Sequence, residues 1–358
     1  MGTNTKLITR VALEVSALIL LGVGCLYLHK SGKITPYERG FYCDDENIKK
    51  PFKEDTVSEV SCFIIWAVIS AAILIAVELV SFISHPPVRN DDVKIPPMIM
   101  EYYRVMGSFC IGAVFCMLAT EMCKVTIGEL RPHFLTICNP NLTQELCYQG
   151  YDQNLASPED QKYRRYGMKF VEGINCSYTE TISGVKFTKA RWEKKVSDAR
   201  KSIISGHSSF SFYCAVFLTL YLGTRLINLK AKEKFIGTQR RGSLPAFILL
   251  ISKALRPFIQ FGLLATAFFI CLSRVSDYKH HPRDVISGGL FGSLSAYLTF
   301  TYIADLSSKP RLVYGNEFEE YDEIDAKSKT AINMENNMES VKMSTLEGKN
   351  VDLEEAQS

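Results

Sequence analysis

The sequence lacks several features that would point to other classes of protein. Its 41 Lys and Arg residues nearly balance its 38 Asp and Glu residues, so the formal net charge is only +3, and we expect no nucleic-acid partner. No internal repeat is obvious. The polar motifs described below lack the clustered carboxylates that Mg²⁺ favours. The sequence therefore predicts no metal site and no cofactor.

Apolar residues are instead concentrated in long runs, although their overall share of 47% is that of a soluble protein. A helix needs about 20 apolar residues to cross the ~30 Å hydrocarbon layer of a membrane. Six runs approach that length, so the sequence predicts an all-α, polytopic membrane protein. The first run can also be interpreted as a cleaved signal peptide, but its length favours an uncleaved helix. The six predicted spans are 7–28, 60–83, 105–123, 208–229, 255–272 and 285–303.

The remaining segments define the domain boundaries. We expect one six-helix transmembrane domain over 1–304, with a long hydrophilic loop over 124–204. Residues 305–358 are acidic and poor in apolar periodicity, so they are predicted to form a disordered cytoplasmic tail. Glu14 and Glu78 lie near the ends of predicted spans, where we expect interfacial water to solvate them.

The hydrophilic loop carries two N-glycosylation sequons, at Asn141 and Asn175. One such tripeptide is weak evidence, but two in a cysteine-bearing loop favour an oxidising compartment and at least one disulfide. The pairing cannot be deduced from the sequence. The candidate disulfide residues are Cys43, Cys138, Cys147 and Cys176. The other seven cysteines lie in the apolar runs and are predicted to be packing residues.

The sequons and cysteines also set the orientation. If the loop over 124–204 is extracellular or luminal, the fourth span runs inward and the basic segment 230–241 is cytoplasmic, in agreement with the positive-inside rule. Three polar clusters, each at the end of an apolar run, then lie at the same outer face of the membrane.

Two of these clusters resemble parts of an anion-binding site. Lys124 and Arg131 are seven residues apart, so on a helix they would share a face about 10 Å apart and converge on one dianion. Ser205, Gly206 and His207 begin an apolar run, where glycine permits close backbone approach and a helix N-terminus attracts anions.

The third cluster follows the fifth run and contains Arg274, His280, His281 and Asp284. On a helix, His280 and Asp284 would share a face, so that the carboxylate orients the imidazole as a nucleophile or base. His281 could also reach Asp284, at a spacing of three residues.

Each cluster alone has a simpler interpretation. The cations can extend to the headgroups, the serine can cap a helix, and the paired histidines can lie in a solvated loop before a helix capped by the aspartate. Three cations, two histidine positions and a carboxylate at one membrane face together indicate a phosphate site.

The spacing of these residues resembles the three-part signature of the type 2 phosphatidic acid phosphatase superfamily, which includes vanadium haloperoxidases and glucose-6-phosphatase. That signature is Lys, six residues, Arg-Pro; then Pro-Ser-Gly-His; then Ser-Arg, five residues, His, three residues, Asp. The matching residues are Lys124, Arg131 and Pro132; Ser205, Gly206 and His207; and Ser273, Arg274, His280 and Asp284. Ile204 stands where proline is usual. Six helices and a sequon-bearing loop make the chain most similar to the animal lipid phosphate phosphatases.

The resemblance implies a helical core and a covalent mechanism. His280, oriented by Asp284, would attack phosphorus to form a phosphohistidine, and His207 would protonate the leaving alcohol and later activate water. The phosphate-binding residues implied are Lys124, Arg131, Ser205, Gly206 and Arg274. The implied partners are lipid phosphates: phosphatidate, lysophosphatidate, sphingosine 1-phosphate and ceramide 1-phosphate. The expected location is the plasma membrane, and homo-oligomerisation is left open.

Three other functions fit the sequence less well. A non-enzymatic lipid-binding relative would be expected to lack a reacting residue, and all of them are present. A transporter would place its polar groups near mid-membrane, whereas these clusters lie at helix ends. A haloperoxidase is the third alternative, but the haloperoxidases of the superfamily are soluble, whereas this chain has six predicted spans.

Overall fold

The computed structural model describes residues 35–84, 97–142, 147, 170–236, 243–304 and 306, with scattered helical residues between 9 and 24. Long helices dominate this part of the chain. They are α2 (Glu59–Ser84), α3 (Pro97–Ile127), α8 (Gly206–Ile236), α9 (Ser243–Ser276) and α10 (Pro282–Leu298), which continues into the π-helical turn η3 (Thr299–Ile303). The shorter elements are β1 (Phe41–Tyr42), η1 (Glu46–Ile48), α4 (Phe134–Cys138), β2 (Phe170–Val171), β3 (Thr181–Ile182), β4 (Val185–Lys186) and α7 (Lys189–Ala199).

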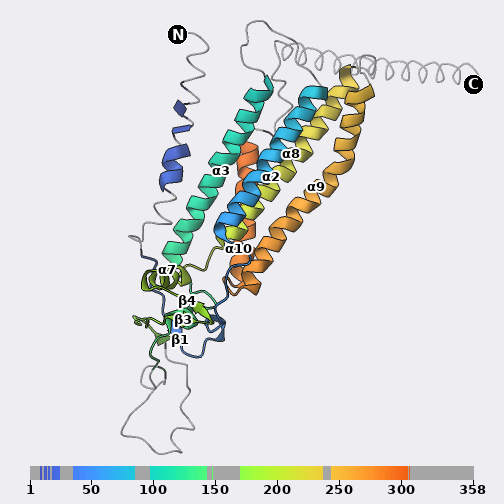
Figure 1. The fold of residues 1–358 in the computed structure, drawn as a ribbon. Helices are drawn as coiled ribbons and strands as arrows, with labels where there is room; N and C mark the ends of the chain where they lie inside the picture. Colours follow the sequence, from blue (N-terminus) through green and yellow to red (C-terminus); the bar gives the residue numbers. More distant parts are fainter. Residues whose placement is uncertain are drawn as a thin grey trace, which may run out of the picture.

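The long helices run side by side as a bundle, with the short elements gathered at one end (Figure 1). Helix α8 packs against α2, α3, α9 and α10. A helix that is apolar on all sides is expected to be surrounded by other elements. Tyr213, Phe217 and Leu218 of α8 are fully buried, so α8 forms the centre of the bundle.

Glycines allow α10 to approach the start of α8 closely. A Cβ atom added to Gly288 would lie 2.7 Å from the backbone oxygen of Ser205, and one added to Gly292 would overlap the backbone of Ser209. Small residues of this kind let two helix backbones come together. The contact fixes the third motif, at the start of α10, against the second motif, at the start of α8.

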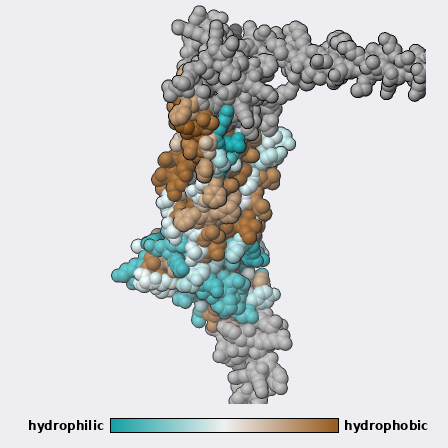
Figure 2. Space-filling model, turned by 90° about the vertical axis from the view of Figure 1, so that its right-hand side faces the viewer, coloured by the Kyte–Doolittle hydropathy of each residue, from teal (hydrophilic) through white to brown (hydrophobic). Residues whose placement is uncertain are grey.

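Apolar side chains cover the outside of the bundle. Figure 2 shows brown, hydrophobic residues along the long helices and teal, hydrophilic residues at the end that carries the short elements. Within the described residues, the stretches Glu59–Ile83, Glu101–Ile127 and Leu250–Ser276 are long and apolar enough to cross a membrane. Phe258 and Phe261 are each 75% exposed. Large apolar side chains exposed together on the bundle surface are expected to face lipid and not water. The protein is therefore an integral membrane protein with a mostly helical fold.

The count of six spans stays a prediction. Part of the first predicted span, the tail apart from Leu306, and residues 237–241 of the basic segment lie outside the described residues. The helix that contains the fifth predicted span is longer than that span, because α9 begins at Ser243 and continues through Pro257. A proline removes one backbone hydrogen bond, which a membrane helix can tolerate when its neighbours support it.

The predicted environment of Glu78 was also wrong. Its side chain is buried between helices, where Oε2 lies 2.9 Å from Nη2 of Arg225 and Oε1 accepts a hydrogen bond from Tyr221. Arg225 also lies 3.7 Å from Glu101. Burial of a carboxylate is tolerated here because an ion pair and a hydroxyl replace water. Glu14 lies outside the described residues.

The short elements form a cap on one end of the bundle. Strand β1 pairs antiparallel with β2, and β3 pairs with β4 as a hairpin. Two disulfides fasten these pieces: Cys43–Cys147, with a Cα–Cα distance of 5.6 Å, and Cys138–Cys176, at 4.5 Å. The six other cysteines in the described part of the chain are free thiols. Asn141 and Asn175 are both exposed on the cap.

Candidate active site

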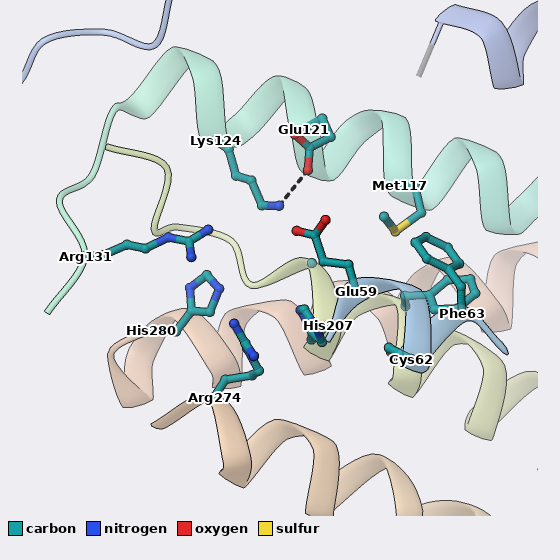
Figure 3. A pocket seen from close by; sticks show the side chains of 12 residues that line it. Glu59, Cys62, Phe63, Met117, Glu121, Lys124, Arg131, His207, Arg274 and His280 are labelled. Carbon is teal, nitrogen blue, oxygen red and sulfur yellow. Dashed lines mark hydrogen bonds and ion pairs between the residues drawn. The ribbon is translucent and has the colours of Figure 1, made fainter. Parts of the chain in front are cut away.

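A pocket lies where the cap meets the bundle, between α2, α3, α8 and the loop that follows α9. One end of the pocket is basic, and the other is apolar (Figure 3). The basic end is lined by Lys124, Arg131, His207, Arg274 and His280. The apolar end is lined by Cys62, Phe63, Met117 and Phe210, and two carboxylates, Glu59 and Glu121, complete the wall. All three sequence motifs therefore contribute to one pocket.

Lys124 reaches the pocket from the last turn of α3. Its ammonium nitrogen lies 2.6 Å from Oε1 of Glu121, one turn earlier on the same helix. A Cβ atom added to Gly206 would lie 3.0 Å from the same nitrogen. Glycine at this position thus lets the lysine approach the N-terminus of α8, where backbone N–H groups attract anions.

Arg131 reaches the pocket from a turn and not from a helix. Helix α3 ends at Ile127, and Gly128 adopts a φ of 62°, which favours glycine. The expectation that Lys124 and Arg131 share a helix face was therefore wrong. The guanidinium is held instead by Asp198 of α7, at 2.9 Å, and by the backbone oxygen of Lys201, at 3.3 Å.

Arg274 lies in the last turn of α9 and is almost fully buried. Its Nη2 lies 2.8 Å from Asp55, and its Nη1 donates to the backbone oxygen of Val57 at 3.2 Å. Nε2 of His207 lies 3.2 Å from the same oxygen. The segment before α2 thus fixes both Arg274 and His207.

The two adjacent histidines lie just before α10, which begins at Pro282. The expected sharing of a helix face by His280 and Asp284 was therefore wrong. Asp284 instead caps its own helix: Oδ2 accepts from the backbone N–H of His281 at 3.0 Å and from Ser202 at 2.5 Å. Nδ1 of His281 lies 3.2 Å from this oxygen, whereas Nδ1 of His280 lies 3.9 Å away. Of the two histidines, His280 lines the pocket.

Ser205 is placed differently from what the resemblance implied. Its backbone N–H donates to the backbone oxygen of Asp284 at 3.1 Å, so this amide is not available to hold a phosphoryl oxygen. The close approach of α10 at Gly288 brings that oxygen within reach. Gly206 lines the pocket, while the buried hydroxyl of Ser205 has no hydrogen-bond partner among the described residues.

The electrostatic environment favours a neutral imidazole at His280. Burial, reinforced by the charges of Arg131, Arg274 and Lys124, lowers the pKa of His280 well below its ordinary value. Burial would raise the pKa of Asp198, but Arg131 and Lys195 hold it below its ordinary value. Asp198 therefore remains an anion that can hold Arg131.

Several residues of the site were not found from the sequence. Asp55 and Asp198 belong to mixed-charge segments far along the chain from the arginines that they contact, so no spacing connects them. Glu121 could have been found, because it precedes Lys124 by three residues on a predicted helix. No group of three or more His, Cys, Asp or Glu residues in the described ranges could hold a metal ion.

Comparison with known proteins identifies the class to which this fold and pocket belong. Residues 105–308 match the PAP2 superfamily. The chain belongs to this superfamily, and the relatives described next are named as phosphatases, which are hydrolases. The matched residues include all three motifs that line the pocket.

Named relatives extend the similarity over most of the chain. A Drosophila melanogaster protein named provisionally as a phosphatidate phosphatase is 33% identical over 323 residues, which cover 87% of this chain and 72% of the relative. Phospholipid phosphatase 1 of Mus musculus is 32% identical over 82% of this chain and 84% of its own length. Phospholipid phosphatase 2 of Homo sapiens is 31% identical over 75% of each chain. No solved structure matches the chain.

Proposed function

We propose that this chain is a lipid phosphate phosphatase that acts through a phosphohistidine at the extracellular or luminal face of the membrane. Its substrates would be phosphatidate, lysophosphatidate, sphingosine 1-phosphate and ceramide 1-phosphate. The observation that carries the proposal is the two-ended pocket, basic at one end and apolar at the other. A lipid phosphate matches this pocket, because it has an anionic phosphate at one end and an apolar chain at the other. The names of the relatives support this substrate class.

In the first step, the Nε2 atom of His280 attacks phosphorus while Nδ1 faces Asp284. A nitrogen–phosphorus bond forms and the ester oxygen–phosphorus bond breaks. The lowered pKa of His280 keeps its imidazole neutral and nucleophilic. Protonated His207 gives its proton to the departing alkoxide, so that the lipid leaves as an alcohol.

In the second step, His207 removes a proton from water as the oxygen attacks phosphorus. The nitrogen–phosphorus bond breaks, phosphate leaves, and His280 returns to its neutral form. Lys124, Arg131 and Arg274 are already fixed by their partners, so they can stabilise developing charge with little rearrangement. Gly206 at the start of α8 adds the positive end of a helix dipole.

The proposed orientation rests on the cap. Two disulfides and two exposed sequon asparagines belong to the end of the molecule that carries the pocket. Disulfides form and persist in oxidising compartments. This supports an active site outside the cytoplasm, and at the plasma membrane the protein would act on extracellular lipid phosphates.

Phosphate release by the purified protein tests the proposal. We expect hydrolysis of lysophosphatidate to persist in excess chelator, because three cations supply the positive charge that Mg²⁺ provides in other phosphoryl-transfer sites. Vanadate should inhibit, since it mimics the five-coordinate transition state. Full loss of activity on chelation, restored by Mg²⁺, would contradict this mechanism. Absence of hydrolysis under every condition would favour a lipid-binding role.

A further inference from the structure

The pocket contains two carboxylates that the proposed mechanism does not use. Glu59 is the first residue of α2, and Glu121 lies on α3. Both line the pocket beside the residues expected to hold a dianionic phosphate. In Figure 3, the carboxylate of Glu59 lies between the basic groups on one side and Met117 and Phe63 on the other. It is therefore at the junction of the headgroup and the lipid chain.

The phosphate end of this pocket is built to receive a ligand. His280 is 3% exposed and lines the pocket, with its Nδ1 atom facing Asp284. The Nε atom of Arg274, which is 2% exposed, has no hydrogen-bond partner among the described residues. Buried polar atoms in this state are unfavourable until a ligand meets them. A phosphoryl group at the basic end, next to Arg274 and Nε2 of His280, would place the next carbons of the substrate toward the apolar end, past Glu59.

A carboxylate already accompanies the lysine and each of the two arginines of the phosphate end. Lys124 faces Glu121, Arg131 faces Asp198 and Arg274 faces Asp55. Glu59 adds a fourth carboxylate to the wall. A negative group at this place repels a substrate whose only charge is the phosphate, and it attracts one that carries a positive charge nearby.

We propose that Glu59, with Glu121 beside it, makes this pocket selective for lipid phosphates that bear a protonated amine on the carbon next to the phosphorylated one. Sphingoid-base 1-phosphates have this chemistry. The ammonium group donates to the carboxylate of Glu59 while the phosphate occupies the basic end. Lysophosphatidate, which has a hydroxyl group at the corresponding position, lacks that interaction. This inference rests on the proposed phosphatase function and narrows its substrate class.

The test compares two substrates that differ in one charge. Sphingosine 1-phosphate and its N-acetyl derivative share chain and phosphate, but acetylation removes the positive charge. The measured quantity is the ratio of kcat/KM for the amine to kcat/KM for the amide, in the full-length protein and in Glu59→Gln. We expect the ratio to fall in the variant on the order of tenfold, as for loss of a close charge pair. The acetyl group adds the same bulk in both enzymes, so its steric effect cancels when the ratio of the variant is compared with that of the wild type.

Glu54→Gln is the matched control. Glu54 precedes α2 by five residues, and its side chain is 66% exposed beside Arg191. Its substitution removes the same charge from the same segment without changing the pocket, so the substrate ratio should stay at the wild-type value. A fall of equal size in Glu54→Gln would show a long-range charge effect and overturn the proposal.

Other outcomes are equally decisive. If the ratio changes by less than about twofold in Glu59→Gln, the carboxylate does not bind the ammonium group, and the proposal is overturned. If both substrates are slowed equally, Glu59 acts on the chemical step, for example through His207, and amine selectivity is again overturned. If the wild type hydrolyses neither substrate nor lysophosphatidate, the failure lies with the phosphatase function itself.

Discussion

Each of the two arginines of the pocket is fixed by one carboxylate and one backbone oxygen. Arg131 contacts Asp198 and Lys201, and Arg274 contacts Asp55 and Val57. The guanidinium fork suits this arrangement, because it has five N–H donors in one plane. Donors that are not used in these contacts can face the phosphate, and their direction is set before the substrate arrives.

A buried histidine beside the site makes stability depend on pH. His133 follows Arg131 and Pro132, is 2% exposed, and its Nδ1 lies 2.7 Å from the backbone oxygen of Tyr278. Burial, with the charges of Arg131 and Lys279, lowers the pKa of His133 to about 3. The folded state therefore keeps this imidazole neutral in mildly acidic solution. The unfolded chain binds a proton below its ordinary pKa of about 6.5.

Because only the unfolded state gains that proton, stability should fall as the pH drops below 6.5 and continue to fall toward pH 3. Between pH 6.5 and pH 5, His133 alone should cost about 2 kcal/mol of unfolding free energy. Thermal unfolding of the detergent-solubilised protein across this range measures the effect. His133→Asn should be less stable at pH 7 but show a shallower pH dependence. An unchanged slope in the variant would show that His133 is not the group responsible.

The motif residues of the site could be predicted because each motif is a short segment with fixed internal spacing. Lys124, Arg131, His207, Arg274 and His280 all line the pocket. The geometry within the motifs could not be predicted in the same way. The helix-face argument failed for Arg131 and for His280, because a positive-φ glycine ends α3 and a proline begins α10.

Among the secondary-structure elements, the pairing of α8 with α10 matters most for the site. Gly288 and Gly292 bring the two backbones into contact. The start of α8 carries His207, and the start of α10 carries Asp284. Separation of these helices would move His207 away from Asp284, so packing along the bundle controls geometry at its end.

Gly292→Ala should therefore lower both stability and activity. The added methyl group overlaps the backbone of Ser209, which cannot move as a flexible side chain would. Overpacking of this kind costs about 1–3 kcal/mol. The matched control is Gly262→Ala on α9, where nothing lies within 4 Å of the added atom. Thermal midpoints and turnover of both variants are the measurements, and equal behaviour of the two would contradict the close-packing account.

Helix positions could be predicted from hydropathy, but helix ends and partners could not. Hydropathy located α2, α3, α8, α9 and α10, because membrane-facing and buried positions are both apolar. It could not show that Glu78 pairs with Arg225 on another helix, since that contact depends on how the bundle closes. The same limit applies to the two disulfides, whose pairing depends on the folded cap.

For the whole molecule, the cap and the apolar bundle divide the protein between water and lipid. The pocket lies at the boundary, where an amphiphile has its headgroup in water and its chain in the membrane. The cap also supplies Asp198, from α7, to the site. An enzyme of this layout can act on a lipid without removing it from the bilayer.

The orientation of the molecule in the membrane can be tested in cells. An epitope inserted in the loop over 124–204 should be labelled by antibody on unpermeabilised cells, whereas a tag after residue 358 should need permeabilisation. Glycosidase should shift the gel mobility of the wild type but not of the double variant Asn141→Gln/Asn175→Gln. The reverse labelling pattern would show that the pocket faces the cytoplasm.

The central claim is that phosphate passes through a covalent bond to His280. The direct measurement is rapid quenching of the purified protein with a lipid phosphate that carries radioactive phosphorus, followed by peptide mapping in alkali, where phosphohistidine survives. We expect an acid-labile label on the peptide containing His280, in the wild type and in His281→Ala, and none in His280→Ala, whose turnover should fall by about 10³-fold or more. A label that persists in His280→Ala and disappears in His281→Ala would reverse the assignment. An enzyme that turns over rapidly without any label would contradict the covalent mechanism.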